Sequence, residues 1–137
     1  MYKRQITEGE TDALTLRCVG LRNVVSLPQG AGGATQTDLS PLLGFSVWLL
    51  STDADEKGEE AAAALRDRAR RIGSDAVRLR WSRLVDDEMV QYKDANEMRQ
   101  AGATDAEFRR CVDMALRQQL GFAPSLGGAM QNTEVAQ

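Results

Sequence analysis

The stretch that most constrains the fold is residues 45–58, where a continuous apolar run ends in two aspartates. The run at 45–51 has the composition of a buried strand, and a strongly helical segment follows at 56–72. Ligands of open α/β sheets bind at the carboxyl ends of the strands. Asp53 and Asp55 stand at such an end, and their spacing on an extended strand points them to the same side. Because crowded carboxylates are costly unless a cation neutralises them, this stretch predicts a metal site.

The absence of histidine limits the chemistry that these acids can perform. It excludes Ser-His-Asp and Cys-His catalysis, and it removes the usual imidazole ligands of zinc. A bound metal must then be held by oxygen ligands, which favours Mg²⁺ or Mn²⁺. Cys18 and Cys111 each fall on the apolar face of a predicted helix, so we expect buried free thiols and a cytoplasmic setting.

Strands and helices alternate around this stretch. We expect strands at 1–7, 24–27, 45–51 and 76–79, a polar irregular connection at 81–92, and helices between and after them. This order predicts an α/β fold: a compact, Rossmann-like sheet of about four mostly parallel strands with helices on both faces. The domain covers residues 1–120, and the Gly, Ser, Gln and Asn content of 121–137 indicates a linker or disordered tail. No apolar run reaches the length of a membrane span, and no membrane partner is expected.

The first predicted strand is unusually polar, since only Tyr2 and Ile6 are apolar beyond Met1. A buried parallel strand is normally a nearly continuous apolar run. Either this strand lies at the sheet edge, or the chain is a fragment whose natural start lies upstream. We favour the fragment.

Helix initiation alone accounts for several of the acids. Thr7 and Glu10 have the spacing of a capping box, and Asp55 by itself serves as a helix N-cap. A cap does not explain why Asp53 stands beside Asp55. The helical spacing predicts three buried faces. The first helix buries Leu14, Cys18 and Leu21. The helix after Asp55 buries Ala61, Leu65, Ala69 and Ile72, and the last helix buries Phe108, Cys111, Val112 and Ala115.

Two further features have a plain interpretation and a functional one. The glycine-rich loop at 28–33 matches neither the Walker nor the dinucleotide pattern, so by itself it is a surface turn. The central arginines favour a solvated face, but a basic patch beside an acidic pocket stays open. These arginines are Arg66, Arg68, Arg70, Arg71, Arg78, Arg80 and Arg83.

Three motifs stand in a fixed order along the chain: Glu8-Gly9-Glu10-Thr11-Asp12, Asp53-Ala54-Asp55 and Lys93-Asp94-Ala95-Asn96-Glu97. Together they resemble the Toprim domain shared by primases, topoisomerases and some nucleases, over about residues 5–115. The third motif is similar to one of phage-type primase–helicases and the related mitochondrial helicase. The resemblance implies a Toprim fold.

The resemblance also implies roles for individual residues. Glu8, Asp53 and Asp55 would be catalytic. Together with Asp94, they would also hold Mg²⁺ or Mn²⁺. A second set would support the site or contact nucleotide phosphates: Asp12, Gly30, Lys93 and Asn96.

The implied function is metal-dependent nucleotidyl transfer in primer synthesis during DNA replication. The implied partners are a single-stranded DNA template, nucleoside triphosphates and other primase or helicase domains, in a bacterial or phage-infected cell. The chain shows no Walker motif, zinc module or template-binding subdomain, so we expect part of a larger primase or primase–helicase whose isolated activity is weak or absent.

Four other functions fit the sequence less well. A Toprim-class nuclease uses similar acids on water, but the motif at 93–97 argues against it. A non-catalytic nucleic-acid- or protein-binding module would not need all the acids. A haloacid-dehalogenase-like phosphatase has a different pattern after its Asp-x-Asp. A topoisomerase is disfavoured because Tyr2 and Tyr92 are the only tyrosines.

Overall fold

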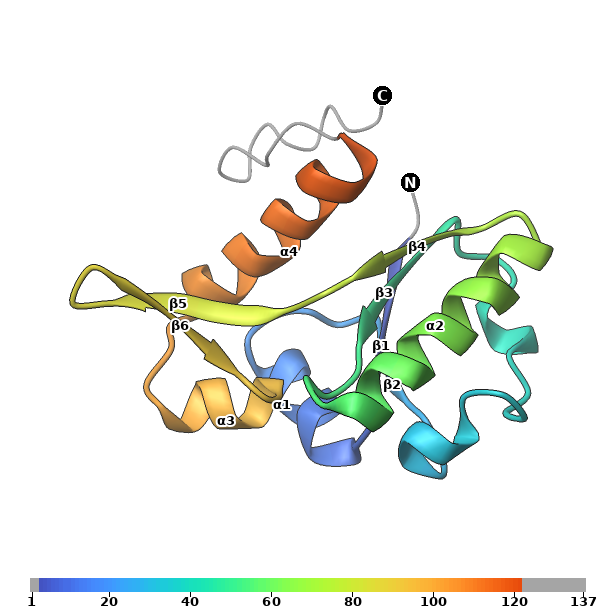
Figure 1. Ribbon diagram of the computed structural model, residues 1–137, viewed down its shortest axis with the longest axis horizontal. Helices are drawn as coiled ribbons and strands as arrows, with labels where there is room; N and C mark the ends of the chain where they lie inside the picture. Colours follow the sequence, from blue (N-terminus) through green and yellow to red (C-terminus); the bar gives the residue numbers. More distant parts are fainter. Residues whose placement is uncertain (1–2, 122–137) are drawn as a thin grey trace.

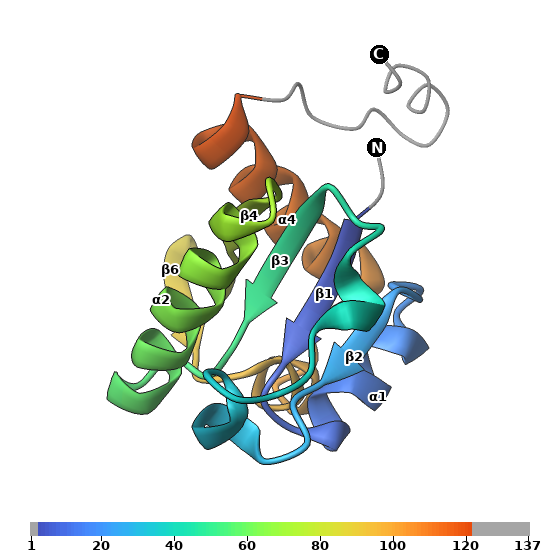
Figure 2. The same cartoon turned by 90° about the vertical axis from the view of Figure 1, so that its right-hand side faces the viewer.

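The core of the computed structural model, which describes residues 3–121, is a parallel sheet of four strands in the order β2–β1–β3–β4 (Figure 2). The strands are β1 (Lys3–Thr7), β2 (Val24–Ser26), β3 (Val47–Ser51) and β4 (Asp75–Arg78). All pairings are parallel. The predicted α/β sheet is therefore confirmed, and the predicted tail at 121–137 lies outside the described residues apart from Gly121.

Helices cover both faces of the sheet, as predicted (Figure 1). Side chains along β3 alternate between the faces, as a pleated strand requires. Val47 and Leu49 face a core shared with α1 (Glu10–Cys18), α3 (Ala95–Gln100) and α4 (Asp105–Leu120). Trp48 and Leu50 face a second core shared with α2 (Glu56–Arg71) and the short 3₁₀ turns η1 (Gly30–Gly33) and η2 (Ser40–Leu42).

The first strand is an interior strand, so its interpretation as a sheet edge is wrong. β1 pairs with β2 on one side and β3 on the other. Its polar Gln5 and Thr7 are nonetheless buried. The Thr7 hydroxyl donates to the Gly9 carbonyl at 2.9 Å, so this buried polar group is satisfied at the strand end.

The predicted apolar face of the first helix is wrong at two of its three residues, since only Leu21 packs against the core. Leu14 and Cys18 are exposed, while Leu16 and Val19 are fully buried. The buried face of α1 begins with Asp12, which turns toward the end of the sheet, and residues four and seven positions later share its direction. Nor does a Thr7–Glu10 capping box form, since the N-cap is Gly9 without a side-chain hydrogen bond.

The other two helices follow their predicted faces more closely. In α2, Ala61, Leu65 and Ala69 are buried, but Ile72 is exposed because the helix ends at Arg71. In α4, the predicted inward residues are all buried, Cys111 among them as a free thiol. The helix starts with the predicted capping box of Thr104 and Glu107.

Residues 81–92 form a β-hairpin rather than the predicted irregular connection. Its strands are β5 (Trp81–Val85) and β6 (Glu88–Tyr92), paired antiparallel. Asp86 and Asp87 both have positive φ, at 51° and 66°, as a two-residue type I′ turn requires. Buried Trp81 packs on Phe108 of α4, with ring centroids 5.3 Å apart, and anchors the base of the hairpin.

The side chain of Gln119 covers the outer edge of strand β4 at Arg78. The Arg78 N–H donates to the Gln119 side-chain oxygen at 2.8 Å, and the Gln119 amide donates back to the Arg78 carbonyl at 2.8 Å. The last turn of α4 thus takes the place of a neighbouring strand at this position.

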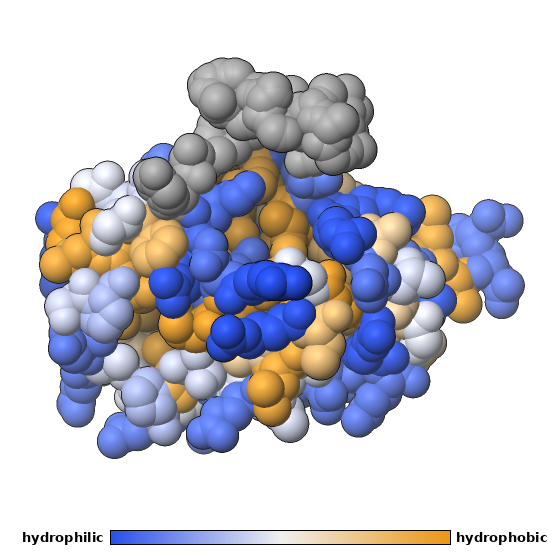
Figure 3. Space-filling view, turned by 180° about the vertical axis from the view of Figure 1, so that it is seen from behind, coloured by the Kyte–Doolittle hydropathy of each residue, from blue (hydrophilic) through white to orange (hydrophobic). Residues whose placement is uncertain are grey.

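The surface on the far side of the molecule mixes hydrophilic and hydrophobic residues (Figure 3). Within residues 3–121, no helix has the length and apolarity needed to cross a bilayer.

Candidate metal centre at the ends of β1 and β3

Three loops distant in sequence meet at the carboxyl end of the sheet. They follow β1, β3 and β6. The Ala54 N–H donates to the Lys93 carbonyl at 2.8 Å, which joins the second loop to the third. The Asn96 N–H donates to Asp12 Oδ1 at 2.9 Å, which joins the third to the first. The three motifs identified in the sequence are therefore tied together by one backbone–backbone hydrogen bond and one backbone–side-chain hydrogen bond.

Each of these three segments contributes one carboxylate to a common point, and the first of them, Asp12, lies in the first turn of α1. One oxygen each from Asp12, Asp53 and Asp94 all lie within 4.8 Å of one another, with Asp12 buried and the other two half-buried. Hard divalent cations such as Mg²⁺ and Mn²⁺ prefer such oxygen ligands. The donor set therefore fits the cation predicted from the sequence.

Glu8 lies against the backbone of this cluster. Its Oε2 accepts a hydrogen bond from the Asp53 N–H at 2.8 Å. It is not one of the three carboxylates that approach most closely, but it fixes the start of the loop that carries Asp53. Its role as a ligand or general base stays a prediction.

The acids of the cluster have raised pKa values. Burial, with a smaller contribution from the neighbouring carboxylates, raises the pKa of Asp12 from 3.8 to about 6. Burial is also the main cause that raises the pKa of Asp53 and of Glu8, again reinforced by nearby acids. The protein has thus gathered more negative charge here than it neutralises, and a bound cation would relieve that excess.

Lys93 provides part of the counter-charge. Its Nζ lies 3.6 Å from Asp53 Oδ2 and 3.7 Å from Asp55 Oδ2. Both carboxylates raise the pKa of Lys93, Asp53 most of all. The Lys93 side chain is 53% exposed.

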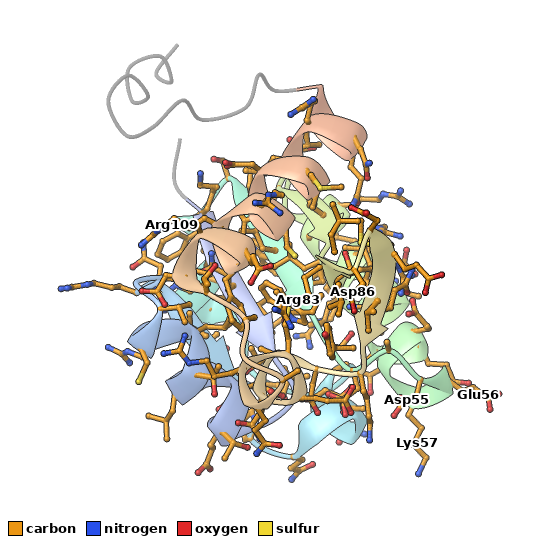
Figure 4. All side chains as sticks on the ribbon, turned by 90° about the vertical axis from the view of Figure 1, so that its left-hand side faces the viewer. Asp55, Glu56, Lys57, Arg83, Asp86 and Arg109 are labelled. Atoms are coloured by element: carbon orange, nitrogen blue, oxygen red, sulfur yellow. The ribbon has the colours of Figure 1, made fainter. Side chains whose placement is uncertain are left out.

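Asp55 and Asp94 also cap helices. Asp55 Oδ1 accepts from the Gly58 N–H at 2.8 Å, and Asp94 Oδ1 accepts from the Glu97 N–H at 2.7 Å. The N-cap interpretation of Asp55 is therefore confirmed, although the same side chain faces Lys93. Figure 4 shows Asp55 with Glu56 and Lys57 at the start of α2, away from Asp86 on the hairpin.

The remaining predicted residues lie around the cluster. Besides its backbone bond to Asp12, Asn96 accepts through Oδ1 a hydrogen bond from the Thr15 hydroxyl at 3.3 Å. Gly30 begins η1 with φ +60°, and its N–H donates to the Leu27 carbonyl. Among the described residues, Gly30 makes no hydrogen bond to the carboxylates, so its part in the site stays a prediction.

Gly58 is a positioning residue that the sequence analysis missed. A Cβ at this position would lie 1.9 Å from the Asp53 carbonyl oxygen and 2.8 Å from Glu8 Oε2. The Thr52 hydroxyl donates to the Gly58 carbonyl at 2.7 Å. The first turn of α2 thus sits directly on the loop after β3. A glycine three residues after the second aspartate, inside a strong helix signal, was the available clue.

Arg78 is the second residue that was missed. Its buried guanidinium donates to the carbonyls of Leu50, Thr52 and Asp53 at 2.8–3.0 Å. It also pairs with Glu59 at 2.9 Å. The arginine therefore holds the end of β3 and the loop with Asp53 in one conformation. Its place within a charge run gave no sign of this role.

Comparisons with known proteins agree with this geometry. Residues 5–99 match a protein family described as Toprim-like. The structure resembles the primase fragment of the bacteriophage T7 primase-helicase protein, with a TM-score of 0.62, 28% identity, and 81% of this chain and 44% of that chain covered. No curated protein matches the sequence.

Two further structures share the fold. One is the bacteriophage T7 lagging-strand DNA polymerase with primase domains of two gp4 subunits bound to an RNA/DNA hybrid and dTTP; its TM-score is 0.58, at 28% identity, covering 81% of this chain and 53% of that one. The other contains the zinc-binding and RNA polymerase domains of the Aquifex aeolicus primase, with a TM-score of 0.55, 20% identity, and 87% and 30% covered. The chain therefore spans about half or less of these structures.

Proposed function

Because the chain belongs to the Toprim-like family, we propose that it is the metal-dependent catalytic domain of a DNA primase, within a larger primase or primase–helicase. The observation that carries this proposal is the convergence of Asp12, Asp53 and Asp94, from three distant segments, to within 4.8 Å. The likeness to a primase fragment at 28% identity supports the reaction class.

In this function, Asp53 and Asp94 would hold Mg²⁺ or Mn²⁺, together with Asp12. When bound, the ion lowers the pKa of an attacking 3′-hydroxyl and offsets the charge of nucleotide phosphates. Glu8, whose pKa is raised by burial, is placed beside Asp53 to accept a proton or to bind the ion. Asp55 keeps α2 in place, and Lys93 offers a positive charge to the phosphates of a nucleoside triphosphate.

The ligands follow from the same reasoning. A structural relative is bound to an RNA/DNA hybrid and dTTP, which supports a nucleic-acid template and nucleoside triphosphates as ligands here. The structural relatives extend well beyond the part that this chain matches, so other primase or helicase domains are proposed to complete the active protein.

The test of the metal site is calorimetric titration of the full chain with Mn²⁺, comparing wild type with Asp53→Asn. We expect the variant to lose at least about tenfold in affinity, because a carboxylate ligand is replaced by a neutral amide of the same shape. Asp86→Asn, at the hairpin tip, is the matched control and should bind as wild type does. Unchanged binding by Asp53→Asn would reject the site.

The reaction class needs a second measurement. Purified chain, Mn²⁺, nucleoside triphosphates and a single-stranded template are combined, and products are separated by size. Short oligonucleotides that disappear with Asp53→Asn would support primer synthesis. Metal-dependent nicking of plasmid DNA without any oligonucleotide product would instead assign a nuclease.

A further inference from the structure

A groove of about 530 Å³ lies beside the metal centre, between α2 and α4. We call it the arginine groove. Figure 1 shows these two helices on either side of the ribbon that runs from β4 into β5. Its lining includes Ala63 and Arg66 of α2, Met114 of α4, and Arg78 and Arg80 between them. None of the clustered carboxylates lines the groove, so it is distinct from the metal centre.

The charge of the groove is positive. Three arginines and one acid, Glu59, are its charged residues, which leaves two positive charges in excess. Arg78 and Arg80 both bind Glu59, at 2.9 and 2.6 Å. Arg66 is half-buried in the wall and has no protein acceptor among residues 3–121. An anion is the ligand that this arrangement suits, since a guanidinium fork matches phosphate geometry.

Arg68 of the same helix, by contrast, has protein acceptors. Two residues along the same helix, Arg68 donates to the carbonyls of Ala34 and Thr37 at 2.9 and 2.7 Å on the other side of α2. Arg68 therefore joins α2 to the loop after η1, whereas Arg66 has no such structural task.

The groove is linked to the metal centre through its own residues. Arg78, which lines the groove, donates through Nη2 to the Asp53 carbonyl at 3.0 Å. Glu59, in the first turn of α2, follows closely after Asp55. A chain of phosphates held by Arg66 and Arg80 would therefore continue toward the acidic cluster. Apolar surface from Met114 and Ala63 is available to the bases.

We propose that the arginine groove binds the backbone of single-stranded nucleic acid and leads that strand to the metal centre. The identity of the polymer rests on the proposed function. Binding of this kind is sequence-tolerant and strongly salt-dependent, because positive side chains track the phosphates.

The test is the fluorescence anisotropy of a labelled oligothymidylate of about 12 nucleotides, within the site sizes typical of such grooves. It is titrated with the full chain in EDTA at low salt. Arg66→Glu should weaken binding at least about tenfold, because a charged hydrogen bond to phosphate is replaced by repulsion. The slope of log affinity against log salt should fall by about one for this variant.

A second pair of variants avoids relying on one arginine. Ala63 is exposed on the groove wall, and both substitutions suit a helix. Ala63→Glu should weaken binding, and Ala63→Lys should strengthen it. Thermal unfolding of each variant verifies that the fold is kept.

Arg109→Glu is the matched control, with the same change of charge on α4. Arg109 lies beside Gly20, is labelled in Figure 4, and does not line the groove. Its variant should bind much more tightly than Arg66→Glu.

Asp53→Asn separates this inference from the proposed function. In EDTA it should still bind the oligonucleotide, even if it has lost Mn²⁺. An Asp53→Asn variant that loses metal binding but still binds the oligonucleotide would therefore support the groove independently of the metal site. The inference is overturned if wild type does not bind, if Arg66→Glu and Ala63→Glu bind as wild type does, or if duplex DNA binds as tightly as the single strand.

Discussion

Two charged regions meet at the backbone of Asp53, and they treat their charges in opposite ways. On one side, Asp12, Asp53 and Asp94 crowd together, with Lys93 as their nearby cation. On the other side, Glu59 is held by two arginines, whose hydrogen bonds lower its pKa to about 2, whereas burial raises that of Asp12 to about 6. Charges that the protein neutralises itself hold the fold, and charges that it leaves crowded are the ones available to a ligand.

The largest effect is expected from removing the centre of the neutralised region. Arg78→Met removes a side-chain donor from the carbonyls of Leu50, Thr52 and Asp53, and it removes the buried partner of Glu59. The free energy of unfolding should fall by about 3–5 kcal/mol in urea titrations. Arg80→Met is the control, because the Arg80 side chain is 50% exposed, and should cost less than about 1 kcal/mol. Equal losses would mean that Arg78 is not the clamp described above.

A somewhat smaller effect is expected where the two regions share the first turn of α2. Gly58→Ala places a methyl group against the Asp53 carbonyl and the Glu8 carboxylate. We expect about 3 kcal/mol of destabilisation and a weaker affinity for Mn²⁺, because the loop with Asp53 must shift. Gly44→Ala is the matched control, since its Cβ would meet nothing within 4 Å. Wild-type metal affinity in a folded Gly58→Ala would separate Gly58 from the site.

The crowded acids should give a pH dependence of characteristic sign. Because the pKa of Asp12 rises from 3.8 to about 6, the folded protein keeps a proton that the unfolded chain releases. In EDTA, stability should therefore fall by roughly 2 kcal/mol as the pH rises from about 4 to 6. Urea titrations of Asp12→Asn should lack this component. Mg²⁺ should restore stability to wild type above pH 6, and a variant that keeps the full pH dependence would contradict this origin.

The smallest effect has the opposite sign and belongs to Glu59. Its pKa falls from 4.5 to about 2, so its contribution is present above pH 4.5 and is lost as the pH falls toward 2. The Glu59 side chain is 43% exposed, and solvent screening leaves about 0.5–1 kcal/mol of this contribution. The difference in unfolding free energy between wild type and Glu59→Gln should therefore shrink below pH 4. If this difference in unfolding free energy instead grew below pH 4, Glu59 would not be stabilised by its two arginines in the way described.

Local patterns were enough for much of the fold and for the position of the site. The apolar run before Asp53, the stripe of α2 and the capping box of α4 are properties of neighbouring residues, and sequence patterns report those. The three acidic motifs could also be identified in this way, because each is a run of neighbouring residues.

The features that depend on distant partners could not be predicted in this way. β1 is interior because two strands flank it, although its composition is that of an edge. The hairpin at 81–92 turns on Asp86 and Asp87, without the glycine that usually marks such a turn. Arg78 resembles its neighbouring arginines in sequence and differs only in being buried among carbonyls. The approach of Asp12 to Asp53 and Asp94 required the fold itself.

The side chain of Gln119 has a consequence for how copies of this protein behave in solution. An uncovered sheet margin is a template on which another chain can add a strand, and such growth leads to aggregation. At Arg78 both backbone groups are already occupied by one glutamine, so an invading strand would first have to displace the end of α4. The final helix therefore protects solubility as well as contributing to the core.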